Sequence, residues 1–146
     1  MLFRSAAITA SIIADELGFA PVALDKRLRE RHAGEWQGLT RAEVEERFPG
    51  YLAENRRPPN FETAQVAGAR AAQCLVAIGL QLAGGTALAV SHGGILRALR
   101  VWAGIHDDVT FANLSGQWFE LDGEQLIAGE LVALVSSERP APATPL

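Results

Sequence analysis

The chain has 146 residues, of which 49% are apolar and 21% are charged, so its length and composition suit one globular domain with a sizeable core. Its 13 basic and 17 acidic side chains give a net charge of −4. A negative net charge excludes attraction of the chain as a whole to nucleic acid or to an anionic membrane. The single cysteine, Cys74, excludes an intrachain disulfide, and no run of about eighteen apolar residues predicts a membrane span. We therefore expect a cytoplasmic protein.

The first predicted element is a helix over Leu2–Leu17, which Gly18 ends as a C-terminal cap. A secretory signal peptide is the other interpretation of a segment that opens with Arg4, but this stretch is rich in Ala and Thr and its apolar residues recur at helical spacing. A short strand over Pro21–Leu24 is predicted next. It is followed by a charged segment over Asp25–His32.

Two helices are predicted in the middle of the chain. Thr40 and Glu43 have the spacing of a capping box, and the short helix that they open ends at a Pro-Gly pair. Apolar residues at helical spacing predict a long helix over Glu62–Leu82. Gly68 and Gly79 each weaken this helix by about 1 kcal/mol relative to Ala, so packing must stabilise it.

The last third of the chain predicts a strand, a helix and a hairpin. Thr86–Ser91 is a continuous apolar run, typical of a strand buried on both faces of a parallel sheet. The inner face of the next helix is predicted to carry Ile95, Leu99 and Trp102. Gln117–Leu121 and Leu126–Gly129 alternate like edge strands on either side of an Asp-Gly turn.

These elements predict one α/β domain over residues 1–135, followed by a disordered Pro-rich tail over residues 136–146. The domain presents a difficulty. A strand over Thr86–Ser91 needs hydrogen-bonding neighbours on both edges, and few other segments could supply them. The predicted sheet is short of one strand.

His92 is the first candidate for chemistry. It ends the predicted strand, and Gly93 and Gly94 then open a helix, so that a ligand could approach free backbone N–H groups closely. This order predicts a phosphate site, although a tight turn in which the imidazole only caps or packs would leave the same pattern. An oxyanion loop of the α/β-hydrolase type is excluded because the chain has no G-x-S-x-G segment.

A basic run supplies the second group of candidates. Four of the 13 basic residues fall within six positions, at Lys26, Arg27, Arg29 and Arg31. A solvated charged face would explain the run, but arginine also suits phosphate oxygens, and Glu30 among them could serve as a general acid. The three histidines have no cysteine or carboxylate at ligand spacing, so neither a metal site nor a cofactor is expected.

Taken together, the motifs resemble those of the histidine phosphatase superfamily, which includes the phosphoglycerate mutases. "RLRERHAGEWQGLT" is similar to the family's L-R-E…G-x-W-x-G segment, "VSHGGILRAL" to its second-histidine motif and "ANLSGQW" to its L-x-N-x-S strand entry. The first helix resembles its R-A-x-x-T-A-x-x-I-A-x-x-L-G helix. The resemblance implies the three-layer, mainly parallel sandwich of the phosphoglycerate mutases.

The resemblance also implies roles for individual residues. His92 corresponds to the second pocket histidine, which contacts the transferring phosphoryl group, and Glu30 to the acid that protonates the leaving oxygen. Trp36 looks structural, and the family's G-E-S segment is matched only in part around Glu62. The residues implied in phosphate or substrate binding are Arg31, Gly93, Asn113 and Arg4. Arg4 lies one residue from the family's position, where Ser5 stands, and its side chain would point about 100° away.

One departure from the family matters most. The family's nucleophile is a histidine in an R-H-G motif at the end of its first strand, and the chain contains no R-H-G. The same segment would supply the strand that the predicted sheet lacks, so we expect the 146 residues to be N-terminally truncated and inactive or very weak alone.

The expected function is phosphoryl transfer through a phosphohistidine, most simply by a phosphomonoesterase that hydrolyses small phosphorylated metabolites. A phosphoglycerate mutase and a non-catalytic protein that binds a phosphorylated ligand or inorganic phosphate remain as alternatives. A nonfunctional remnant is the third. The expected partners include neither nucleic acid nor membrane, and an unpaired sheet edge would allow a homodimer.

Overall fold

The structure is a computed structural model of the chain, and it describes residues 5–19 and 21–133. Within these ranges the chain forms four α-helices, two 3-10 turns and one hairpin. The helices are α1 (Ser5–Leu17), α2 (Arg41–Arg47), α3 (Ala64–Leu82) and α4 (Gly93–Trp102). The strands are β1 (Ser115–Asp122) and β2 (Gln125–Ala133), and the 3-10 turns are η1 (Lys26–Leu28) and η2 (Gly34–Trp36). No helix in the described ranges is long and apolar enough to cross a membrane.

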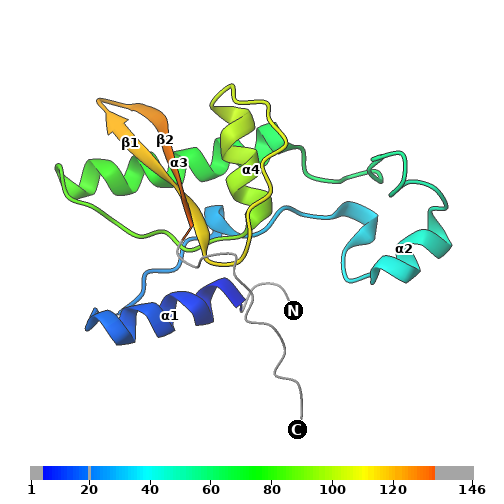
Figure 1. Cartoon of the computed structure of the whole chain (residues 1–146), viewed down its shortest axis with the longest axis horizontal. Coiled ribbons are helices and arrows are strands. Elements are labelled where there is room, and N and C mark those ends of the chain that lie inside the picture. The colour runs from blue at the N-terminus through cyan, green and yellow to red at the C-terminus, as the bar shows by residue number, and fades with distance from the viewer. Residues whose placement is uncertain (1–4, 20, 134–146) are drawn as a thin grey trace, which may run out of the picture.

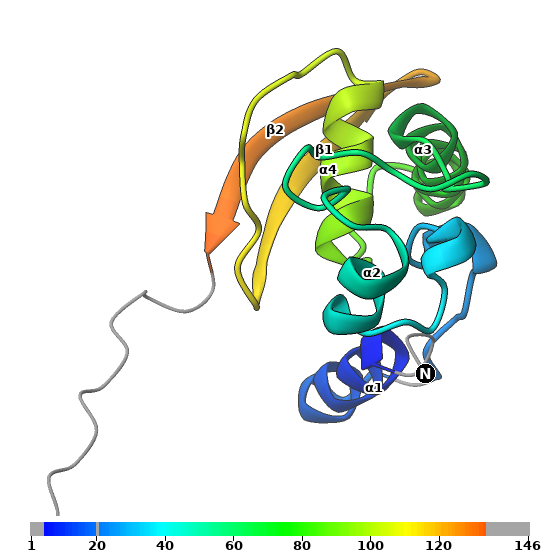
Figure 2. The same ribbon diagram turned by 90° about the vertical axis from the view of Figure 1, so that its right-hand side faces the viewer.

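The core lies where α3 packs against α4 and the hairpin covers both helices (Figures 1 and 2). Ile95 and Cys74 are its largest fully buried side chains. A Cβ atom at Gly68 would overlap the carbonyl of Ala98, and one at Gly79 would overlap Leu121. Both glycines therefore permit close packing, which compensates for the helix propensity that they lose.

The hairpin confirms its prediction and is longer than the alternation indicated. β1 and β2 pair antiparallel from Ser115 opposite Ala133 to Asp122 opposite Gln125, and the register shifts between Gln117 and Phe119. Gly123 adopts the positive φ that the two-residue turn requires.

The two other predicted strands are absent from the described part of the chain. Residues 21–24 and 86–91 are extended, but no backbone hydrogen bond engages either segment there. Residues 86–89 are exposed, so the prediction of a strand buried on both faces is wrong for these 146 residues. The hairpin is the only sheet among the described residues, and the parallel three-layer sandwich is not confirmed. An extended segment becomes a strand only beside a hydrogen-bonding neighbour.

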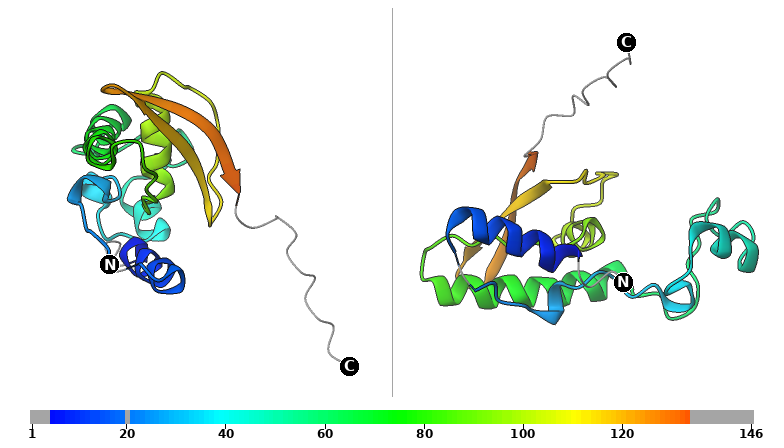
Figure 3. Two further views of the ribbon diagram at one scale, coloured as in Figure 1. Left: turned by 90° about the vertical axis from the view of Figure 1, so that its left-hand side faces the viewer. Right: turned by 90° about the horizontal axis from the view of Figure 1, so that it is seen from below.

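Helix α1 lies apart from the core, on the far side of segment 83–92 (Figures 1 and 3). It ends at Leu17, and Gly18 follows with the expected positive φ. None of its residues is buried, and Ile8, Ile12 and Leu17 are all more than half exposed. Arg4 and the predicted tail over residues 136–146 lie outside the described residues.

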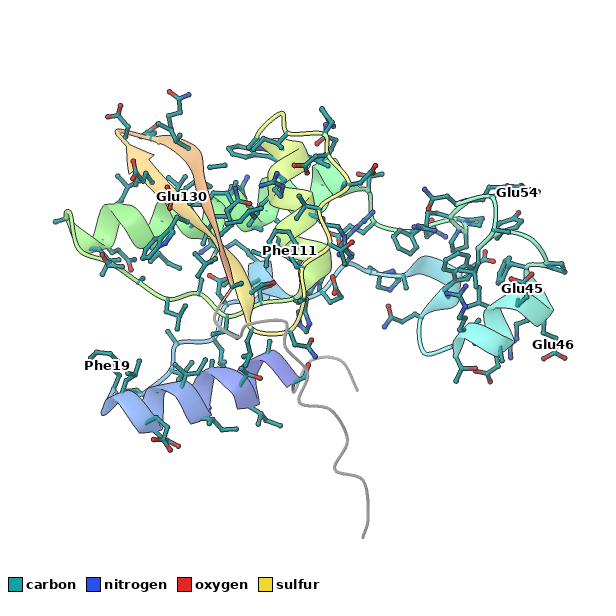
Figure 4. All side chains as sticks on the ribbon, viewed as in Figure 1. Phe19, Glu45, Glu46, Glu54, Phe111 and Glu130 are labelled. Carbon is teal, nitrogen blue, oxygen red and sulfur yellow. The ribbon has the colours of Figure 1, made fainter. Side chains whose placement is uncertain are left out.

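Residues 33–61 form a lobe that projects from the body along its long axis (Figures 1 and 3). Thr40 and Glu43 close the predicted capping box at the start of α2. Side chains of Trp36, Phe48, Tyr51 and Phe61 pack edge-on or tilted to hold the lobe together. A single antiparallel bridge between Ala33 and Phe61 joins the two chain segments at its base. Figure 4 shows the carboxylates of Glu45, Glu46 and Glu54 at its outer surface.

Candidate functional site

The Glu30 carboxylate and the backbone of His92 come from distant parts of the sequence and both lie at the N-terminus of α4. The Ser91 hydroxyl donates a hydrogen bond of 2.7 Å to the Leu28 carbonyl, which joins the segment before His92 to the segment before Glu30. A Cβ atom at Gly94 would overlap the Glu30 carboxylate. Glycine at this position therefore allows the carboxylate to lie directly against the first turn of α4.

His92 is the N-cap residue of α4, with extended backbone angles of φ −121° and ψ 150°. Its imidazole makes no capping hydrogen bond, which leaves a packed imidazole as the structural alternative to a phosphate site. The first N–H groups of a helix have no intrahelical acceptor and favour an anion. The N-terminus of α4, which follows His92 directly, is therefore a position suited to phosphate oxygens.

A third segment borders this position. Phe111 lies against Gly93, and Figure 4 shows it beside α4. The loop then turns at Asn113 and Leu114 before β1 begins. Asn113 is exposed, and no hydrogen bond links its side chain to another described residue. The structure thus brings its loop to the site without giving its amide a partner.

Arg31 is held rigidly beside Glu30. Its Nε and Nη2 donate hydrogen bonds of 3.0 and 2.6 Å to the Glu62 carbonyl, and its guanidinium lies 5.0 Å from the centre of the Phe61 ring. Burial and then the nearby charge of Arg57 lower the pKa of Arg31 from its ordinary value. A cation that is partly buried beside another cation is a favourable position for a bound anion.

Arg70 on α3 is a positioning residue that the sequence interpretation missed. Its guanidinium forms an ion pair of 2.7 Å with Glu62 and donates hydrogen bonds to the carbonyls of Arg27, Arg29 and Glu30. It thereby fixes the backbone that carries the Glu30 carboxylate. These bonds also hold the pKa of Glu62 below its ordinary range. The sequence feature that could have identified Arg70 is a charged side chain next to the apolar stripe of α3.

The basic run divides into three kinds of residue. Lys26 and Arg29 are exposed, as the solvated-face interpretation expects. Arg27 forms a bidentate ion pair with Asp25, and these bonds hold the pKa of Asp25 far below its usual range. Arg31 is the member that reaches the site. Cys74 is buried, and burial raises the pKa of its thiol to about 11.

No group of three or more His, Cys, Asp or Glu side chains within residues 5–19 and 21–133 is arranged to hold a metal ion. The chemistry available at the described site therefore consists of a carboxylate, an imidazole, a guanidinium and the N-terminus of α4. These groups suit binding and proton transfer at a phosphate ester.

Comparison with known proteins places this site in context. Residues 3–125 match the family model described as the histidine phosphatase superfamily, branch 1. The chain is 49% identical over 47 residues to glucosyl-3-phosphoglycerate phosphatase of Mycolicibacterium vanbaalenii, a match that covers 32% of this chain and 20% of that protein. It is 34% identical over 98 residues to phosphoglycerate mutase-like protein 4 of Arabidopsis thaliana, covering 62% and 43%. The match thus spans less than half the length of either relative, and no solved structure matches significantly.

Proposed function

Because this chain belongs to the histidine phosphatase superfamily, we propose that it serves phosphoryl transfer, as a phosphomonoesterase acting on small phosphorylated metabolites. The observation that carries the proposal is the meeting of Glu30 with the N-terminus of α4, next to His92. These groups are drawn from two segments about sixty residues apart and joined by the bond between Ser91 and Leu28.

In the proposed site, the first N–H groups of α4 and the His92 imidazole bind the phosphoryl oxygens. Arg31 holds a further anionic part of the substrate. Glu30 in its acid form donates a proton to the ester oxygen as the bond from phosphorus to that oxygen breaks, so that the product leaves as a neutral alcohol. The glycine at position 94 supports this role because it lets the carboxylate approach the helix terminus.

The nucleophile is proposed to lie on a polypeptide segment outside the 146 residues. A histidine on that segment would attack phosphorus and form a phosphohistidine, and water would then hydrolyse it with Glu30 accepting the proton. The unpaired, extended segment 86–91 supports this proposal, since it offers its backbone to a new strand. A strand running parallel to it would end beside His92, because the carboxyl ends of parallel strands share one edge.

The test compares hydrolysis of an aryl phosphate by the 146-residue chain and by a chain extended upstream to the preceding in-frame start codon. We expect the extended chain to be faster by at least about a thousandfold. Equal activity of the two chains would contradict the proposed source of the nucleophile.

The role of Glu30 has a separate test in the extended chain. Glu30→Gln should lower kcat/KM, which reports the steps up to cleavage of the ester, by a factor of about 10² to 10⁴ on an alkyl phosphate and much less on an aryl phosphate, whose leaving group needs little protonation. Arg41→Gln, at an exposed position on α2, is the matched control and should leave both rates unchanged. A Glu30→Gln variant with equal losses on both esters would contradict proton donation by Glu30.

A second candidate function is binding of a phosphorylated ligand without turnover. The absence of an R-H-G motif from the 146 residues favours it. It predicts that the 146-residue chain binds phosphate, that His92→Ala abolishes this binding, and that no upstream in-frame R-H-G sequence exists.

A further inference from the structure

A cavity of about 200 Å³ lies between α4, the start of α3 and the loop that follows α4. Four charged residues line it, namely Arg31, Arg97, Arg100 and Asp107, and Val101 and Ile105 form part of its apolar wall. Arg97, Arg100 and Val101 project from one face of α4, because residues three and four apart lie together on a helix. The cavity does not include His92 or Glu30.

The charges around this cavity do not balance. Arg100 is 7% exposed and fully engaged, since it forms an ion pair with Asp107 and donates a 2.8 Å hydrogen bond to Gln117. That pair uses the one carboxylate of the lining. Arg31 directs two nitrogens at a neutral carbonyl, and no hydrogen bond engages its Nη1 within the described part of the chain.

Arg97 is the adaptable member of the group. Its side chain is exposed, its Nη1 lies on the side of Gly93, and no ion pair or hydrogen bond to another described residue uses its guanidinium. The nearby charges of Glu30 and Glu62 raise the pKa of Arg31, and the charge of Arg97 lowers it by a smaller amount, so the Arg97 guanidinium is within electrostatic reach of Arg31. Neither Glu30 nor Glu62 lines the cavity, and two cations that face one cavity whose only carboxylate is already paired are stabilised by an anion.

We propose that this cavity is a second anion-binding site, which takes an oxyanionic group, a carboxylate or a phosphate, between Arg31 and Arg97. The planar guanidinium groups suit bidentate bonds to such a group. The backbone of Arg97 lies five residues beyond His92, about 7.5 Å along the helix axis at the usual rise, and its Nη1 reaches back to the side of Gly93. Two sources are therefore within reach, namely a second acidic group of the molecule bound at His92 and a separate free anion.

The experiment titrates inorganic phosphate into the 146-residue chain at low ionic strength and follows arginine Nε–H and backbone N–H signals by NMR. Wild type, His92→Ala, Arg97→Gln and the exposed control Arg41→Gln are compared. We expect phosphate to shift the Arg97 and Arg100 signals in wild type and in His92→Ala. Arg97→Gln should raise the Kd read from the Arg100 signal about tenfold, and Arg41→Gln should change it less than twofold.

The possible results separate this site from the proposed function. If phosphate shifts the Gly93 and Gly94 signals but never those of Arg97 and Arg100, the second site is overturned and the phosphate site at His92 stands. If the Arg97 and Arg100 signals move while the glycine signals do not, the second site stands and the proposed function loses its phosphate position. An unchanged Kd in Arg97→Gln would also overturn the second site.

A final comparison identifies the source of the oxyanion. Methyl phosphate carries one acidic group, whereas phosphoglycolate carries a phosphate and a carboxylate. If one molecule occupies both sites, phosphoglycolate binds wild type about tenfold more tightly than methyl phosphate, and Arg97→Gln removes the difference. Equal binding of the two compounds assigns the second site to a separate anion.

Discussion

The two sides of the body use similar apolar residues with opposite results. On the closed side, formed by α3, α4 and the hairpin, Ile95 is 0% exposed. On the open side, formed by α1 and residues 83–90, Ile12 is 57% and Leu88 66% exposed. The difference shows that burial depends on a facing layer rather than on apolar composition. The closed side has three interlocking elements, whereas on the open side no strand formed by residues 5–19 or 21–133 lies between α1 and the core.

The candidate site lies where these two sides meet. His92 is joined on one side to the first turn of α4, which includes the buried Gly94 and Ile95, and on the other to segment 86–91, whose residues 86–89 are exposed. On the closed side, the ion pair of Arg70 with Glu62 and the hydrogen bond from Arg70 to the Glu30 carbonyl fix the backbone that carries Glu30, which we call the Glu30 wall of the site. One wall is therefore rigid, whereas the other borders apolar surface of the kind that marks an interaction site.

The strongest test of the difference between the closed and open sides is to make the same Ile→Ala substitution on each. Ile95→Ala should lower the free energy of unfolding by about 2–5 kcal/mol, because it opens a cavity in a packed core. The matched variant Ile12→Ala should change it by less than about 0.5 kcal/mol. Urea unfolding measures both. Equal losses in the two variants would mean that α1 is as well packed in solution as α4.

The next largest loss of stability is expected where the closed and open sides meet, at Arg70. Arg70→Gln leaves the Glu62 carboxylate without its guanidinium partner and frees three backbone carbonyls, so we expect a loss of about 2–3 kcal/mol. Gln65→Ala, at an exposed position on the same helix, is the control and should be nearly neutral. If Arg70→Gln costs no more than Gln65→Ala in urea unfolding, the Arg70 network does not hold the Glu30 wall.

A smaller effect should appear in the dependence of stability on pH. The bonds from Arg70 lower the pKa of Glu62 in the folded chain, so this carboxylate contributes stability that is fully present above its unfolded pKa of about 4.3. The contribution disappears as the pH falls through the folded pKa. Urea unfolding between pH 6 and pH 3 should therefore show a smaller acid loss in Arg70→Gln than in wild type. An identical slope in both would contradict this linkage.

The smallest effect is expected on the open side itself. Leu88→Ser should change the free energy of unfolding by less than about 0.5 kcal/mol, because Leu88 is already largely solvated. Size-exclusion chromatography of the same variant tests whether the exposed apolar segment promotes self-association, as its unpaired backbone allows. A loss of 2 kcal/mol or more on urea unfolding would show that this segment is buried in solution.

Local sequence signals predicted much of what the structure shows. The capping box of α2, the end of α1 at Gly18, the helix that begins after His92 and the hairpin around Gly123 are all present. Each depends on residues within a few positions of one another. The strand over residues 86–91 was the main error, because its apolar run describes a buried environment that the described residues do not supply.

The candidate site was predictable only in part. Glu30, Arg31 and His92 were identified from motifs, whereas Arg70 was missed, since a lone arginine on a helix carries no motif. Nor could spacing show that Gly94 makes room for the Glu30 carboxylate, or that Arg97 shares a cavity with Arg31.

The sequence by itself determined the helices, the hairpin and the residue types suited to phosphate chemistry, because those features follow from backbone preferences and short-range spacing. Only the tertiary structure decided which apolar segments are buried and which charged groups meet. The contacts of Ser91 with Leu28 and of Arg70 with Glu30 span 63 and 40 residues of sequence. Such contacts depend on which helix faces pack together, and no local pattern encodes that choice.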